Sequence, residues 1–167
     1  MTSRRILQTG CLVLGPGIML LIFACSENRS TLIENPTPAV EAALVLSDSA
    51  PPVSGELVVS VQANSNQGTV GSYTARITYD PAALRYESEI AIDDKGLRAS
   101  NPTAGLLRFA GAAATGFTDG RLASYRFTVL RANSASSLAL VVDEMHMISR
   151  VDARSTLTVA PNRTTLR

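Results

Sequence analysis

GSYTARITYDPAAL, residues 71–84, is the stretch of sequence that decides the fold of this chain. Apolar and polar side chains alternate strictly through its first nine residues, as they do in a β-strand with one buried face, because successive side chains leave opposite faces of a sheet. The inward residues are Tyr73, Ala75, Ile77 and Tyr79, and the outward residues are Ser72, Thr74, Arg76 and Thr78. Asp80-Pro81 then predicts a turn, since proline gives no N–H to a neighbouring strand.

Strand-like segments separated by Gly, Pro and Asn turns fill the rest of the chain from residue 40 onward. They are residues 40–46, 56–63, 84–92, 97–99, 106–113, 123–129, 138–148 and 155–159. With the opening stretch they predict an all-β, two-sheet antiparallel β-sandwich of eight or nine short strands. No alternation of strands with helices occurs, which argues against a parallel α/β sheet.

The first 24 residues have the pattern of an export signal. Arg4 and Arg5 form a short positive region, and residues 6–24 carry no charge. The segment ends LIFAC and resembles the bacterial lipobox, in which a small residue precedes a lipidated cysteine. The resemblance implies lipidation of Cys25 and a membrane anchor, and Ser26 in place of aspartate favours the outer membrane or cell surface. A retained anchor helix and an ordinary signal peptide are the alternatives.

The exported part of the chain divides into a tether at residues 25–39, a domain at residues 40–160 and a polar tail at residues 161–167. All 14 acidic residues but only 13 of the 15 basic ones follow position 24, so this part has a formal net charge of −1. No basic stripe remains, which argues against binding to nucleic acid. Cys11 and Cys25 are the two cysteines, so the domain is expected to hold together without a disulfide.

Three segments in order resemble a cohesin domain over roughly residues 40–160. They are ITYDP at 77–81 with Leu84 after it, GLLRFA at 105–110 and GRLASYRFTV at 120–129. The resemblance implies a jelly-roll sandwich that acts without chemistry, as a module docking a dockerin, which is a small helical calcium-binding module, in polysaccharide degradation. It also implies that the outward side chains of residues 71–79 and 106–110 contact the partner: Thr74, Arg76, Thr78 and Arg108. An ordinary solvated sheet face is the alternative interpretation of these four residues.

Two other kinds of binding role stay open from the sequence. A carbohydrate-binding module usually presents aromatic rings to a sugar, and this chain has no Trp. Phe117 lies in a predicted loop, where it either stacks on a sugar or caps the end of the sandwich. An envelope or secretion-assembly lipoprotein is the third possibility, because related sandwiches occur in secretion machinery.

Catalysis is the least supported function, because a catalytic site needs a convergent acid, base or nucleophile. The single histidine, His146, falls within a predicted strand, and no free cysteine remains. We expect no cofactor. Calcium at Asp93-Asp94 or at Asp119 is a weak option, since carboxylates and loop carbonyls suit that ion, but these residues are first explained as turn formers.

Overall fold

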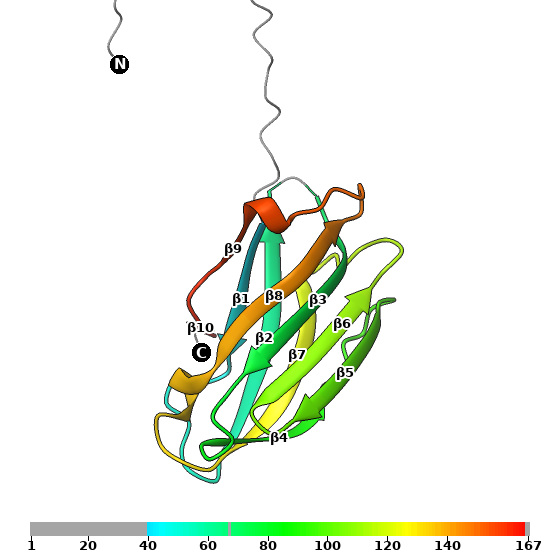
Figure 1. Ribbon diagram of the computed structural model, residues 1–167. Coiled ribbons are helices and arrows are strands. Elements are labelled where there is room, and N and C mark those ends of the chain that lie inside the picture. Colours follow the sequence, from blue (N-terminus) through cyan, green and yellow to red (C-terminus); the bar gives the residue numbers. More distant parts are fainter. Residues whose placement is uncertain (1–39, 67, 166–167) are drawn as a thin grey trace, which may run out of the picture. The chain divides into compact units, whose positions relative to one another are not determined.

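The computed structural model describes residues 40–66 and 68–165 (Figure 1). The export signal, Cys25 and the tether lie outside the described residues. The described part contains ten strands and two short 3₁₀-helices: β1 (Val40–Leu46), β2 (Glu56–Ser65), β3 (Val70–Thr78), β4 (Leu84–Glu89), β5 (Leu97–Thr103), β6 (Leu106–Ala112), β7 (Arg121–Val129), η1 (Ser134–Ser137), β8 (Ala139–Met147), η2 (Arg154–Thr156), β9 (Leu157–Val159) and β10 (Arg163–Thr164). Within these ranges no helix is long and apolar enough to cross a membrane.

The strands form two sheets that pack face to face, which confirms the predicted sandwich. The six-stranded sheet has the order β10-β1-β2-β7-β4, with β9 also pairing with β1. The four-stranded sheet has the order β5-β6-β3-β8, and these strands lie in front of β1, β2 and β7 in Figure 1. All pairs are antiparallel except those of β9 and β10 with β1, which are parallel.

The core lies between the sheets and contains the residues predicted to point inward in β3. Ile77 is fully buried, and Tyr73, Ala75 and Tyr79 are at most 8% exposed. Aromatic rings from the two sheets meet there edge to face, with centroid separations of 5.2 Å for Tyr79–Phe127 and 5.5 Å for Phe109–Tyr125. Each such buried ring contributes roughly 1.5–3 kcal/mol from removal of its surface from water.

Asp80 organises the turn that ends β3, as its sequence context predicts. Its Oδ1 accepts the Ala82 N–H at 2.8 Å, and its carbonyl accepts the N–H groups of Ala83 and Leu84 at 2.9 Å. The same carboxylate pairs with Arg131 at 2.6 Å. Leu84 then returns to the core with no exposed surface.

Several strand boundaries differ from the prediction, and the described residues form ten strands, where the prediction is eight or nine. β5 continues through Pro102 to Thr103, because β5 is an edge strand that pairs only with β6 and proline is tolerated at such an edge. β4 ends at Glu89, so the last three residues predicted for it lie in a loop. β10 lies within the predicted polar tail, where Arg163 pairs with Val45 of β1 and forms an ion pair with Glu41.

Candidate functional site

The four partner-binding residues implied by the sequence lie together on the outer face of the four-stranded sheet. Strand register places Arg76 of β3 directly opposite Arg108 of β6, while Thr74 lies opposite Ala110. Thr78 lies opposite Leu106 at the end of the same face. We call the outward residues of β5, β6, β3 and β8 the docking face.

A bulge in β8 changes the charges on the docking face. The register shifts between Thr74 and Ala75, which pair with Glu144 and Val142, so Asp143 is an extra residue in β8. Asp143 accepts a hydrogen bond from Arg76 at 2.6 Å and neutralises its charge. This pairing offsets the repulsion expected between two arginines placed directly opposite each other.

Two charges of the docking face have no such partner. Arg108 is exposed, and Glu144 is exposed on β8, two residues along the strand axis from the row of Arg76 and Arg108. Among the residues that the structure describes, neither side chain forms an ion pair. They are therefore free to meet charges on another molecule.

A hollow lies on the docking face above β6, where the side chains are small. Its volume is about 380 Å³, and its floor and walls include Leu97, Ala99, Ala110, Ala112, Thr74 and Glu144. A second hollow of about 230 Å³ shares Thr74, Ala99 and Ala110 and reaches Arg108. We call the two together the β6 groove. Leu97 stands at its rim with 78% of its surface exposed, although leucine is usually buried.

The residues of the β6 groove were missed by the sequence interpretation, except Thr74 and Arg108. The sequence predicts strands at residues 97–99 and 106–113 but does not predict that Leu97 is exposed or that Ala110 and Ala112 line a groove. The alternation of side chains in this strand could have predicted the groove. Leu107 and Phe109 are buried, so Ala110 and Ala112 lie on the opposite, outer face of the sheet.

The outer face of the six-stranded sheet is different, because most of its charges pair with one another and only Arg121 of β7 has no ion pair among the described residues. Arg126 pairs with Glu56 at 2.9 Å, and Arg85 pairs with Glu87 at 2.8 Å. Thr128 donates a further hydrogen bond to Glu87 at 2.6 Å. This face therefore resembles an ordinary solvated surface on which most charged groups already have a partner.

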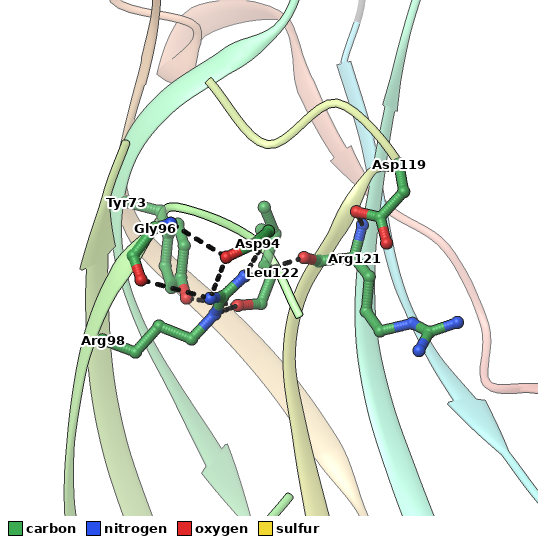
Figure 2. A network of polar contacts seen from close by, with 7 residues as sticks. All are labelled: Tyr73, Asp94, Gly96, Arg98, Asp119, Arg121 and Leu122. Carbon is green, nitrogen blue, oxygen red and sulfur yellow. Dashed lines mark hydrogen bonds and ion pairs between the residues drawn. The ribbon is translucent and has the colours of Figure 1, made fainter. Parts of the chain in front are cut away.

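Arg98 is one of the residues that line the β6 groove, and Figure 2 shows its network of polar contacts. Its guanidinium donates to both carboxylate oxygens of Asp94, at 2.7 and 2.6 Å. Its Nε donates to the Leu122 carbonyl at 2.5 Å, and the Tyr73 hydroxyl donates to the same oxygen at 2.6 Å. The guanidinium carbon also lies 4.9 Å from the centre of the Phe117 ring. Arg98 thereby ties β5 and the loop before it to the start of β7.

Both titratable partners of Arg98 have shifted pKa values. The hydrogen bonds from Arg98 lower the pKa of Asp94 from 3.8 to about 2, even though burial of the carboxylate opposes this. Burial raises the pKa of the Tyr73 hydroxyl from 10.0 to about 12. Arg98 therefore faces an ionised carboxylate and a neutral phenol at neutral pH.

The low pKa of Asp94 predicts a specific pH dependence of stability. A carboxylate whose pKa falls on folding stabilises the protein fully above its unfolded pKa, 3.8, and loses that contribution as pH falls toward about 2. We expect Asp94→Asn to unfold more easily than the wild type at pH 7, with the difference shrinking between pH 4 and pH 2. Denaturant unfolding at several pH values measures this. A difference that stays constant down to pH 2 would contradict the assignment.

The sugar-stacking prediction for Phe117 is wrong. Its side chain is 2% exposed and packs against Tyr73 with a centroid separation of 5.3 Å. Gly116 has φ +78°, a conformation that favours glycine, and the Phe117 N–H donates to the Val70 carbonyl at 2.9 Å. This backbone path turns the ring inward, where it caps one end of the core.

Two of the three acidic residues considered for calcium, Asp94 and Asp119, already bind other groups. Both oxygens of Asp94 accept from Arg98, and Asp119 accepts the Arg121 N–H at 3.0 Å (Figure 2). No group of three or more His, Cys, Asp or Glu side chains in residues 40–66 and 68–165 is arranged to hold a metal ion. His146 lies in β8 as predicted, opposite Ser72.

Comparison with known proteins identifies the family. The cohesin domain model matches residues 43–159. A non-cellulosomal cohesin from the hyperthermophilic archaeon Archaeoglobus fulgidus has a similar fold, with a TM-score of 0.53, 18% identity, and coverage of 74% of this chain and 88% of that one. A type II cohesin domain from the cellulosome of Acetivibrio cellulolyticus gives a TM-score of 0.55 at 16% identity, covering 75% of this chain and 92% of that one.

A third similar structure is a complex. It contains the sixth cohesin of scaffoldin B from Acetivibrio cellulolyticus bound to a mutant Cel5 dockerin, with a TM-score of 0.55, 14% identity, and coverage of 76% of this chain and 99% of that one. A comparison with curated protein sequences gives no match. The match over residues 43–159 shows that this chain belongs to the cohesin domain family.

Proposed function

We propose that the docking face binds a dockerin-type helical module. The contrast between the two outer faces is the observation that carries this proposal. The six-stranded sheet pairs most of its own charges, whereas the docking face combines an apolar groove, the exposed Leu97 and the unpaired charges of Arg108 and Glu144. Exposed apolar surface bordered by polar groups is typical of a protein interaction site.

Aromatic stacking on a sugar has less support. Seven of the eight aromatic residues lie in the described part, and six of these are at most 8% exposed. Tyr86 is the remaining one and is partly buried, with its ring against Tyr125 and Phe127. A flat aromatic platform of the kind that binds polysaccharide is therefore missing from residues 40–66 and 68–165.

We further propose that the chain is exported and held at the bacterial envelope through lipidated Cys25. The lipobox-like end of the apolar segment supports this, and a tether of 15 residues, 25–39, would reach on the order of 20 Å from the lipid. The protein would then recruit a dockerin-bearing enzyme to the cell surface. Mass spectrometry of the purified protein tests the anchor: diacylglyceryl-Cys25 at the N-terminus is the expected result, and an unmodified or retained segment contradicts it.

Calorimetric titration with dockerins tests the docking function. The full chain, in mild detergent, is titrated with each dockerin encoded by the same genome and with the Cel5 dockerin as a reference, in calcium and then in EDTA. We expect at least one dockerin to bind with a Kd of about 1 μM or lower in calcium and not in EDTA. The proposal fails if no dockerin binds under either condition.

A further inference from the structure

The charges on the docking face have a definite geometry that limits which helix fits. Each pair of neighbouring strands is about 4.8 Å apart, and two residues along a strand span about 7 Å. Arg108 lies two strands away from Glu144 and one such step along the strand. The two unpaired charges are therefore separated by roughly 12 Å across the surface, on either side of β3.

Arg76 lies next to Arg108 but adds no unpaired positive charge to the docking face. Asp143 holds its guanidinium at 2.6 Å, and both side chains of the pair are between a third and two fifths exposed. The charges that remain are positive at Arg108 and negative at Glu144. The docking face therefore has a positive charge at one end, Arg108, and a negative charge at the other, Glu144. The β6 groove lies beside the line that joins these two residues.

We infer that the partner helix carries an acidic and a basic side chain about two turns apart, with an apolar side chain between them on the same face. A rise of 1.5 Å per residue makes roughly 12 Å equal to about eight residues, and positions seven or eight apart lie on one side of a helix. The apolar side chain enters the β6 groove on the side lined by Thr74 and Ala110. The acidic side chain meets Arg108 and the basic one meets Glu144.

The helix crosses the strands obliquely, because Arg108 and Glu144 differ both in strand and in position along the strand. Its path passes over β3 beside Thr74, which lines both hollows of the β6 groove. This inference rests on the proposed docking function and specifies the chemistry of its partner.

A selection experiment tests the pattern. The probe is a phage-displayed library on a calcium-loaded dockerin scaffold, with the exposed positions of one helix randomised, and the bait is the full chain in mild detergent. The wild type should enrich an acidic and a basic residue about seven or eight positions apart. Arg108→Glu should enrich two basic residues, and Glu144→Arg should enrich two acidic residues, each by at least about tenfold over the unselected library.

The controls separate this inference from the function on which it rests. Arg126→Ala on the six-stranded sheet should select the same pattern as the wild type, and unchanged thermal melting would confirm that each bait is folded. The inference is overturned if dockerin clones are retained but all baits enrich the same residues, or none. If no bait retains any dockerin clone, the docking function fails together with the inference.

Discussion

Replacing Ala110 with glutamate is expected to weaken the proposed dockerin binding by about 100-fold or more, while the domain stays folded. Ala110 belongs to both hollows of the β6 groove, so a larger charged side chain there blocks the groove at its centre. Substitutions at the centre of an interface commonly have effects of this size, because the site must lose water and pack closely. Ala110 is only half-buried, which leaves room for glutamate to extend into solvent in the free protein.

Val58→Glu is the matched control for this prediction. Val58 is also half-buried and points outward from a central strand, but it lies on the six-stranded sheet, where it pairs with Arg126. Titration calorimetry with the same dockerin should show unchanged affinity for Val58→Glu, and thermal melting should show similar stability for both variants. Equal losses of affinity in the two variants would argue that binding does not depend on the docking face.

Replacing Arg98 with methionine lowers the free energy of unfolding by about 3 kcal/mol, equivalent to roughly 10 °C in melting temperature. The Arg98 side chain is 9% exposed and that of Asp94 is 21% exposed, so removal of the guanidinium leaves a largely desolvated carboxylate without its partner. The Leu122 and Arg121 carbonyls each lose a donor as well, at 2.5 and 3.3 Å. Unfolding in urea measures the effect.

Arg126→Met serves as the control, because the ion pair between Arg126 and Glu56 is exposed at both ends. Such a surface pair contributes about 0–1 kcal/mol, so this variant should be nearly as stable as the wild type. Arg98→Lys should fall between the two, since lysine restores the charge but not the paired donors to Asp94. If Arg98→Met and Arg126→Met shift stability equally, the interactions of Arg98 do not stabilise the fold as described.

Arg98 also supports the docking face, because it holds the edge strand β5 in position. It fixes β5 against β7 through the Leu122 carbonyl, and its neighbours Leu97 and Ala99 line the β6 groove. Loss of this anchor is expected to let the edge strand move and to weaken dockerin binding, in addition to the loss of stability. The fraction of folded variant is measured first, and the affinity from the calorimetric titration is then calculated for the folded protein alone. A loss of affinity that remains after this correction is an effect on binding and not on stability.

Much of the fold could be predicted from local sequence. The period of two in residues 71–79 identified β3 and its inward side chains, and Asp80-Pro81 identified the turn, because both signals depend only on neighbouring residues. The resemblance to cohesin domains is confirmed by the match over residues 43–159. Cohesin domains are non-catalytic binding modules, which agrees with the expectation that this chain is not an enzyme.

The remaining features depend on contacts between distant residues. β10 exists because Arg163 and Thr164 pair with β1, more than 100 positions away in the sequence, and nothing in their own composition predicts a strand. The sequence left two alternatives for Phe117, and the choice of the buried one depends on the long-range backbone hydrogen bond from Phe117 to Val70. The pairing of Arg76 with Asp143 depends on a bulge in β8, whose position no sequence pattern indicated.

The central claim is that the outer face of β5, β6, β3 and β8 binds the partner. Methyl NMR spectra of the full chain, recorded with and without a bound dockerin, test it most directly. We predict that the methyl signals of Leu97, Ala99, Ala110 and Val141 shift or broaden on binding, while that of Val58 stays in place. Shifts at Val58 and its neighbours on the six-stranded sheet, with Leu97 and Ala110 unchanged, would contradict the account.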